Sequence, residues 1–313
     1  MDALSDILKT IRLSSSVYFR SDFSAPWGMQ IDAGPFAQFH MVVRGNCRLQ
    51  MDDAETSIGL SSGDIVVFPL GDAHRLGDET GRIYVNGKDV VEAIYRNQPL
   101  FQKGPVHTTL VCGHFEFERS FEHPFLQALP RFIHIRDFDR RELSWLETAT
   151  HVLIHEAGSG NPGADAVVER LAEVMFIQIL RAYLRQHEHS NNFLTALKDT
   201  RINHALSLLH TDPQISWTLA DIAHAVGMSR SAFAVRFKQL VGRTPLDYLT
   251  KWRLQKAREL LKQRHLPIIE IAEQVGYTSD AAFNRAFKRQ FRENPGAVRR
   301  RLSVAECQNS NRK

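Results

Sequence analysis

The sequence LADIAHAVGMSRSAFAVRFK at residues 219–238 returns in altered form as IIEIAEQVGYTSDAAFNRAFK at residues 268–288. Each copy contains an isoleucine and a valine four residues apart, which share one face of a helix. A glycine follows, where a left-handed backbone can end that helix, and then a serine that can cap the next one. The glycines are Gly227 and Gly276, and the serines are Ser229 and Ser279. Each copy therefore predicts a helix-turn-helix.

The second helix of each copy has one apolar and one polar face. In the first copy Phe233, Phe237 and Leu240 fall at helical spacing and predict a buried stripe. The outward residues are small, polar or basic, and a helix with such a face can enter the major groove of DNA. We expect base contacts from Ser231, Ala234, Val235, Asp280, Ala281, Asn284 and Arg285. We expect phosphate contacts, which position the protein without reading sequence, from Arg230, Arg236, Lys238, Arg243 and Lys288.

A long amphipathic segment, residues 244–261, joins the two copies. Its Pro245 suits the first turn of a helix, and leucines supply one apolar side. Two-helix hairpins with glycine turns are common, so one copy alone would be a weak signal. Two copies joined by such a helix are much more specific and predict a tandem module.

Residues 197–302 resemble the DNA-binding domain of the AraC/XylS family of bacterial transcription regulators. The resemblance rests on the two helix-turn-helices, on TPLDYL at 244–249 and on FNRAFK at 283–288. It implies an all-α domain whose two recognition helices enter successive major grooves on one face of the DNA.

The sequence departs from this family pattern in two places. An arginine usually stands two residues before the second phenylalanine; Arg285 keeps it, but the first copy has Val235. The usual Phe-Gly-x-x-Pro ending reads FRENP at 291–295. The first change predicts that the first recognition helix reads thymine methyl groups or only positions the backbone, and that the second carries more of the hydrogen-bond readout.

Charge is distributed unevenly along the 313 residues, whose formal net charge is +4. Residues 1–196 carry 18 Lys/Arg and 25 Asp/Glu, whereas residues 197–302 carry 19 and 9, a net charge of +10. Basic residues can simply solvate helices. Here they coincide with the tandem module, as contacts with phosphates require.

The N-terminal half has a different texture. Short alternating or β-branched runs between Phe39 and Phe117 are separated by glycine and aspartate turns, which predicts a small β-barrel or jelly roll. Beyond residue 121 the pattern becomes helical, so the fold class is α+β with two domains. The helical segments at 139–156 and 164–187 could form a dimer surface or pack against the barrel, and the sequence favours neither.

The order of polar residues in the β region is similar to the two cupin motifs. Gly63-Asp64 followed by Pro69, Gly71 and His74 matches the second motif well, whereas the first keeps only His40 of its usual ligands. The resemblance implies a cupin-like effector-sensing domain ahead of the DNA-binding domain.

Four residues of this domain are candidates for effector or redox chemistry: His40, Cys47, His74 and Cys112. Two histidines fall short of the usual three metal ligands, so we expect structural histidines, no metal and no cofactor. A thiolate near positive charge could react with an oxidant, but a cysteine on a strand is more often a small buried hydrophobe. Because β-barrels and jelly rolls can enclose cavities, the sequence favours a small-molecule cavity over a metal site. The glycine- and proline-rich insertion at 78–105 could cover the cavity as a flap.

These features predict four regions: a sensing domain at 1–188 with a helical dimerisation or packing segment at about 121–188, a linker at 189–196, the DNA-binding domain at 197–302, and a polar tail at 303–313. Three cysteines, no signal peptide and no long apolar run predict a cytoplasmic protein that does not enter a membrane.

The predicted function is that of a sequence-specific transcription regulator, an activator, without enzymatic activity. Its expected partners are double-stranded promoter or operator DNA, RNA polymerase, a small-molecule or oxidant effector and a second copy of the chain. The alternative is a cupin-type metal-dependent enzyme fused to a DNA-binding module, which would need an intact metal site. A helical scaffold for protein partners would leave the basic module unexplained.

Overall fold

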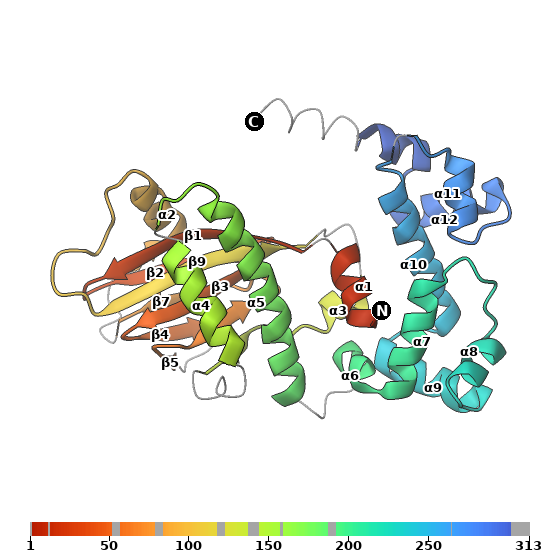
Figure 1. The fold of residues 1–313 in the computed structure, drawn as a ribbon, viewed down its shortest axis with the longest axis horizontal. Coiled ribbons are helices and arrows are strands. Elements are labelled where there is room, and N and C mark those ends of the chain that lie inside the picture. Colours follow the sequence, from red (N-terminus) through yellow and green to blue (C-terminus); the bar gives the residue numbers. More distant parts are fainter. Residues whose placement is uncertain are drawn as a thin grey trace. The chain divides into compact units, whose positions relative to one another are not determined.

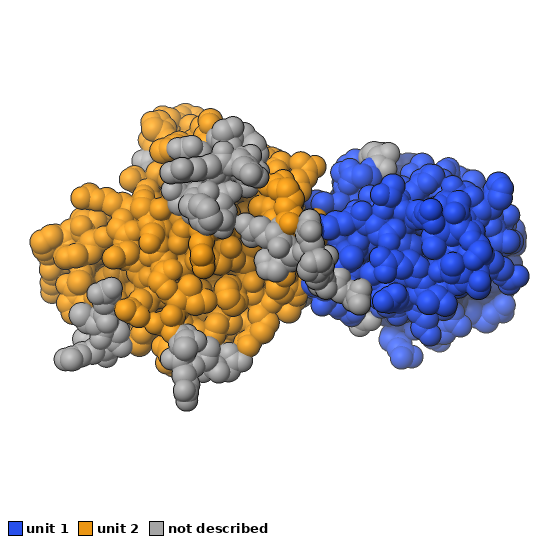
Figure 2. All heavy atoms as spheres, turned by 90° about the horizontal axis from the view of Figure 1, so that it is seen from below, with its two compact units in different colours: residues 1–11, 120–128, 189–313 blue, residues 12–119, 129–188 orange. Residues whose placement is uncertain are grey.

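In the computed structural model the chain forms two compact units (Figures 1 and 2). The β-rich unit consists of residues 12–119 and 129–188, and the helical unit of residues 1–11, 120–128 and 189–313. The structure describes residues 2–11, 13–51, 57–78, 84–117, 123–136, 144–156, 159–186, 192–263 and 265–301. None of the helices in this described part combines the length and the apolar composition that crossing a bilayer requires.

Two five-stranded sheets form the β-rich unit, as the cupin resemblance implied, although they are two sheets and not one closed barrel. The first sheet has the order β1 (Ser14–Phe23), β9 (Thr108–Glu116), β3 (Ala37–Arg44), β6 (Ile65–Phe68) and β10 (Ile133–Ile135). The second has the order β5 (Ser57–Ser61), β4 (Asn46–Met51), β7 (His74–Gly77), β2 (Gly28–Ile31) and β8 (Val85–Asn86). All pairings are antiparallel except that of β2 with β8.

One hydrophobic core joins the two sheets. Side chains from both, such as Phe68 and Leu110 of the first and Leu49 and Leu76 of the second, belong to a single buried cluster. Strands β1 and β9 pair in antiparallel fashion, from Ser14 opposite Glu116 to Phe23 opposite Thr108. Strand β9, which lies between β1 and β3, is buried over most of its length, and its Phe115 contacts Phe176 of helix α5.

Helices cover parts of this unit. Helix α4 (Ser144–Glu156) packs on α5 (Ala164–Gln186), and α5 contacts β1 and β10. The ring of Phe176 in α5 lies 4.7 Å from that of Phe115 in β9, so core packing is the role observed for the predicted helix pair. The described part of the expected flap contains α2 (Gly87–Tyr95), an element that the glycines and prolines of the insertion led us to miss; its Val90 is fully buried.

The helical unit contains the DNA-binding module and two additions. Helix α1 (Ala3–Thr10) contacts α7 and α10, and the short α3 (Pro124–Gln127) contacts α6. The other helices are α6 (Phe193–Lys198), α7 (Thr200–Thr211), α8 (Leu219–Ala225), α9 (Arg230–Val241), α10 (Pro245–Leu260), α11 (Ile268–Gln274) and α12 (Asp280–Phe291). Both helix-turn-helices, α8–α9 and α11–α12, are present, and both contact α10 (Figure 1).

The caps of these helices follow the sequence prediction. The hydroxyls of Ser229 and Ser279 accept hydrogen bonds from the third backbone N–H of α9 and α12 respectively. Gly227 and Gly276 both adopt positive φ, at 65° and 86°. Glycine suits this backbone because a side chain would be strained there.

The observed units differ from the predicted regions in two places. Residues 1–11 and 120–128 pack with the helical unit, although we assigned them to the sensing domain. The predicted linker at 189–196 is described only from residue 192, and its second half begins α6, in which Phe193 and Leu194 are buried. The polar residues before Asn192 masked the short apolar helix that follows.

Candidate DNA-binding surface and effector cavity

The recognition helices α9 and α12 rest on buried phenylalanines and turn polar residues outward. Phe233 and Phe237 in α9, and Phe283 and Phe287 in α12, are fully buried. Val235 is 69% exposed, which is unusual for a valine and leaves its side chain accessible; its contact with thymine methyl groups stays a prediction. Of the twelve predicted residues, Arg230, Ser231, Val235, Lys238, Asp280, Ala281, Arg285 and Lys288 are exposed, and Ala234, Arg236, Arg243 and Asn284 are half-buried.

Two of the predicted phosphate ligands interact within the protein. Nε of Arg236 donates to Oδ2 of Asp199 at 3.0 Å, and the other carboxylate oxygen of Asp199 accepts from the first backbone N–H groups of α7. Arg236 therefore ties α9 to the start of α7. The charge of Arg243 acts on the buried His123 and Tyr248, on whose pKa values it is a smaller influence than burial.

Asn284 is already hydrogen-bonded on the surface of α12. Its Nδ2 donates to the backbone oxygen and to Oδ1 of Asp280, at 2.9 and 3.0 Å. Its own Oδ1 remains as an acceptor, so in this conformation it suits a base that presents a donor. The pair lies at i and i+4, a spacing visible in the sequence, but the sequence alone does not show which way the amide turns.

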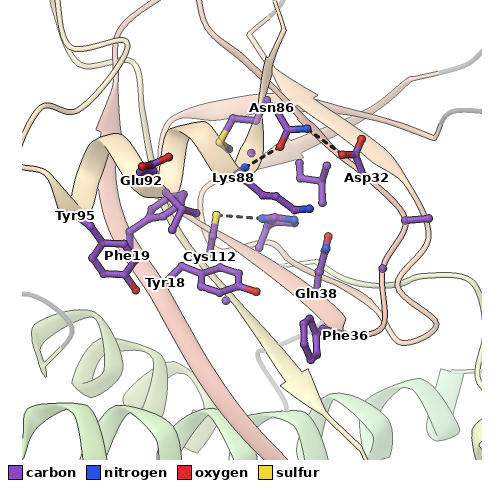
Figure 3. A pocket seen from close by; sticks show the side chains of 18 of the residues that line it. Tyr18, Phe19, Asp32, Phe36, Gln38, Asn86, Lys88, Glu92, Tyr95 and Cys112 are labelled. Atoms are coloured by element: carbon purple, nitrogen blue, oxygen red, sulfur yellow. Dashed lines mark hydrogen bonds between the residues drawn. The ribbon is translucent and has the colours of Figure 1, made fainter. Parts of the chain in front are cut away.

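A cavity of about 610 Å³ lies in the β-rich unit between strands of both sheets and helix α2 (Figure 3). Aromatic and aliphatic side chains line most of it, among them Tyr18, Phe19, Met29, Ile31, Phe36 and Val91. Two of the four predicted effector residues, His40 and Cys112, are in its wall, while His74 and Cys47 lie behind it in the core. Helix α2 belongs to the insertion at 78–105 that we expected to cover the cavity, although we expected no helix there. Residues 32–36, which also line the cavity, were not predicted to do so.

His40 joins Cys112 to His74 in a buried relay. The Asp72 carbonyl can only accept, so Nδ1 of His74, 2.8 Å away, carries a proton. His74 Nε2 then accepts from His40 Nε2 at 2.8 Å, which leaves His40 Nδ1 to accept from the Cys112 thiol at 3.0 Å. When the Cys112 thiol is protonated, each hydrogen bond of this relay has one donor and one acceptor.

Burial determines the protonation states of His40, Cys112 and Cys47. It lowers the pKa of His40 well below the usual range, with a smaller effect from His74. It raises the pKa of Cys112 well above the usual value, and that of Cys47 to about 12. Both thiols therefore stay protonated near neutral pH.

The residues present do not fit the metal site that a cupin fold implies. His40 uses one ring nitrogen on His74 and the other on Cys112, and His74 uses its second nitrogen on Asp72. No cluster of three or more His, Cys, Asp or Glu arranged for a metal ion occurs among the residues described.

Comparison with known proteins agrees with both halves of the chain. Residues 2–185 match the family model described as Cupin, and residues 222–301 match the one described as Helix-turn-helix domain. The "HTH-type transcriptional regulator AlkR" of Acinetobacter baylyi is 32% identical over 300 residues, which cover 94% of this chain and 98% of that protein. A "Putative AraC-like transcription regulator" of Streptomyces lividans is 32% identical over 311 residues, or 96% and 98%. The chain belongs to the AraC family of DNA-binding transcription regulators.

Other known regulators are similar over the whole chain or over part of it. The "RCS-specific HTH-type transcriptional activator RclR" of Escherichia coli is 29% identical over 96% of this chain and 98% of that protein. Among solved structures, an AraC-type regulator from Chromobacterium violaceum is 30% identical and covers 34% of this chain and 94% of that one, with a TM-score of 0.32.

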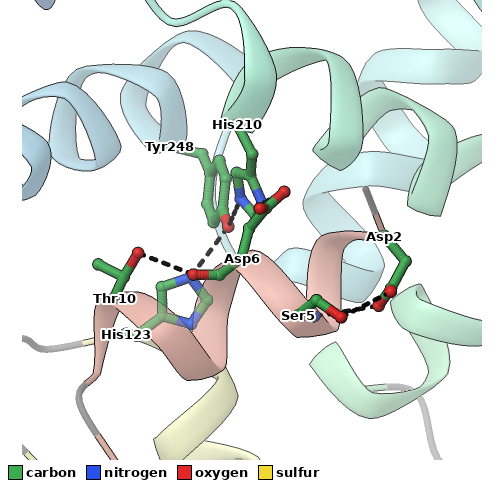
Figure 4. A network of polar contacts seen from close by, with 7 residues as sticks. All are labelled: Asp2, Ser5, Asp6, Thr10, His123, His210 and Tyr248. Atoms are coloured by element: carbon green, nitrogen blue, oxygen red, sulfur yellow. Dashed lines mark hydrogen bonds and ion pairs between the residues drawn. The ribbon is translucent and has the colours of Figure 1, made fainter.

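This AraC-family chain also buries a polar network in its helical unit that we did not predict (Figure 4). Tyr248 of α10 meets two histidines: His123 Nε2 at 2.9 Å and His210 Nε2 at 2.7 Å. The backbone N–H of Phe125 donates to Nδ1 of His123, so His123 donates to the Tyr248 oxygen, and the Tyr248 hydroxyl donates to His210. Nδ1 of His210 faces a carboxylate oxygen of Asp6 in α1 at 3.8 Å.

Three separate stretches of the chain therefore contribute to this network: α1, the residues before α3, and the α7–α10 core. A buried tyrosine is common enough in a helix that Tyr248 gave no signal by itself. The available signal was the spacing of Tyr248 and Trp252, which lie four residues apart in α10 and are both buried. Our prediction of the apolar side of this helix used its leucines instead. One of those leucines, Leu246, is 45% exposed.

Proposed function

We propose that this regulator reads promoter or operator DNA with α9 and α12, and that a small molecule bound in the cavity of the β-rich unit controls this binding. The exposed outer faces of α9 and α12 support the first part, and the cavity supports the second. The geometry favours a small molecule over an oxidant as the effector, because an oxidant reacts with a thiolate and both buried thiols are held protonated.

The cavity favours a mainly apolar ligand with at least one hydrogen-bond donor. Its volume is in the range of cavities that hold small molecules. The Oε1 atom of Gln38 is buried without a hydrogen-bond partner, and a ligand hydroxyl or N–H would satisfy it. Tyr18, whose pKa burial raises to about 12, stays a neutral phenol. Glu92 and Arg96 at the rim pair with each other.

The DNA part is tested by selecting duplexes from a random library with the full-length protein. We expect enrichment of two half-sites in successive major grooves, and protection of both in footprinting. Failure to enrich any sequence at modest salt would contradict sequence-specific binding.

The effector part is tested by thermal unfolding with a naphthol and its methyl ether, a matched pair that differs in the hydroxyl donor. We expect the naphthol to raise the unfolding midpoint more than the ether. Val91→Trp, which fills the cavity, should abolish the effect, whereas Val106→Trp, at an exposed position outside the cavity, should retain it. Equal shifts with both compounds would contradict the role of Gln38.

We further propose that the regulator is a homodimer that activates transcription together with RNA polymerase in the cytoplasm. The outer faces of α4 and α5 support a dimer surface: Val167 and Val174, seven residues apart on α5, and Val152 on α4 are each more than 40% exposed. Val174→Glu should then shift the sedimentation of the protein from dimer to monomer. An unchanged dimer would place the interface elsewhere.

A further inference from the structure

The loop before the first helix-turn-helix meets the turn of the second one. Residues 212–217 connect α7 to α8, and Gly276 forms the turn between α11 and α12. A Cβ atom added at Gly276 would lie 2.9 Å from both the Cα and the carbonyl oxygen of Gln214. The two backbones therefore approach each other so closely that only glycine fits at this position.

Arg253 of α10 holds the same loop. Its Nε donates to the carbonyl oxygen of Pro213 at 2.6 Å, and its Nη2 donates to that of Ile215 at 2.7 Å. Its Cζ would lie 3.0 Å from the Cβ added at Gly276, so the guanidinium also borders the second turn. Because Arg253 binds backbone oxygens, the contact depends on the path of the loop and not on its side chains.

The loop is itself firmly connected to the first helix-turn-helix. The indole N–H of Trp217 donates to the Asp212 carbonyl at 3.0 Å. The next residue, Thr218, forms a capping box with Asp221 at the start of α8. A displacement of the loop would therefore move α8, and with it the buried base on which α9 rests.

We propose that Arg253 and Gly276 are positioning residues that hold the two helix-turn-helices in one fixed relation, and thereby set the half-site spacing that the protein accepts. Without this junction, the helix-turn-helices α8–α9 and α11–α12 would be joined only through helix α10. The junction of Arg253, Gln214 and Gly276 adds a second attachment between them. This inference depends on DNA binding by the family and not on the proposed effector.

The spacing is tested with full-length protein on two duplexes: one selected by the wild type from a random library, and the same duplex with one base pair inserted between the half-sites. The insertion moves the second groove by about 3.4 Å along the axis and rotates it by roughly a tenth of a turn. We expect the wild type to bind the inserted duplex at least about tenfold more weakly. Tolerance of the insertion by the wild type would overturn the proposal.

Two variants loosen the junction. Gly276→Ala pushes the loop away, and Arg253→Lys keeps the positive charge but cannot reach both carbonyl oxygens. In each variant we expect the affinity for the selected duplex to exceed that for the inserted duplex by roughly threefold or less, mainly because the selected duplex is bound more weakly. Arg253→Lys keeps its charge, so the dependence on salt should not change.

Gly227→Ala is the matched control. Gly227 has the same left-handed backbone in the first turn, but its added Cβ would meet no described atom within 4 Å. The Gly227→Ala variant should be less stable than the wild type but keep the wild-type ratio of affinities for the two duplexes. Circular dichroism checks that each variant is folded. If Gly276→Ala does not fold, Arg253→Lys alone tests the junction. A wild-type ratio in the folded junction variants, or an equally reduced ratio in Gly227→Ala, would overturn the proposal.

Discussion

At the scale of single residues, Arg285 and Lys238 are expected to play different parts in DNA binding. Both are exposed, Arg285 on α12 and Lys238 on α9. Arg285→Ala should cost about 1–3 kcal/mol at one base position, because an arginine can bind guanine with two hydrogen bonds. Lys238→Ala should weaken binding to all sequences and reduce the salt slope by roughly 1.

These two variants are compared by titrating selected and scrambled duplexes. If the Arg285→Ala variant loses the same factor in affinity for both duplexes, Arg285 does not read a base. The Asp280–Asn284 pair belongs to the same comparison. Asp280→Ala removes the side-chain partner of the Asn284 amide and leaves its bond to the backbone oxygen, and it should change the base preferred at one position more than the affinity for scrambled DNA.

Arg292 ends α12 where the family pattern has glycine, and the structure shows the cost of this change. Its φ is 61°, in the left-handed region, and its N–H donates to Lys288 as that of Gly242 donates to Lys238 after α9. Arg292→Gly should raise the free energy of unfolding by about 1 kcal/mol, because glycine adopts this backbone without strain. Denaturant titration measures the change. Gly242→Arg, the converse change at the matching position, should lower stability; a gain there would contradict this reasoning.

At the scale of elements, the packing of α1, α3, α7 and α10 should depend on pH. Burial lowers the pKa of His210 in the folded protein to about 3, with a smaller effect from Lys256, against 6.5 for an ordinary histidine. Between these values the unfolded chain binds a proton that the folded chain does not. Stability is therefore full above pH 6.5 and falls as the pH drops, at up to about 1.4 kcal/mol per pH unit from this residue.

Denaturant titrations between about pH 6.5 and 5 test this origin of the acid sensitivity. His210→Gln should reduce the slope, whereas His204→Gln, an exposed position on the same helix, should leave it unchanged. An unchanged slope in His210→Gln would show that other buried histidines, such as His40 and His123, carry the effect.

The helices that the sequence predicted well are those whose ends carry local signals. Ser229, Gly227 and Pro245 mark boundaries by their own chemistry, so α9, α8 and α10 begin or end where predicted. Helix α2 was missed although Asn86 caps it, because the surrounding glycines and prolines suggested a loop. His40 and Cys112 were predicted, but the rest of the cavity wall and the Tyr248 network could not be, since they combine residues far apart in the chain whose contacts depend on tertiary packing.

At the scale of the whole molecule, the net charge of +10 over residues 197–302 should make DNA binding strongly dependent on salt. If six or more phosphates are contacted, affinity should fall by about 10³-fold or more between 50 and 200 mM salt. Fluorescence anisotropy on selected and scrambled duplexes measures both slopes. A flat dependence would mean that the basic residues do not meet the DNA backbone.

The chain passes between the two compact units four times, because residues 1–11 and 120–128 belong to the helical unit. A single proteolytic cut within residues 187–191 would thus sever one connection and leave α1 and α3 seated among the helices of the other fragment. The two fragments should stay together on a sizing column until a denaturant separates them. A gene truncated to encode only residues 192–313 would yield the recognition helices without the partners of Tyr248 and His210, and its product should be prone to aggregate.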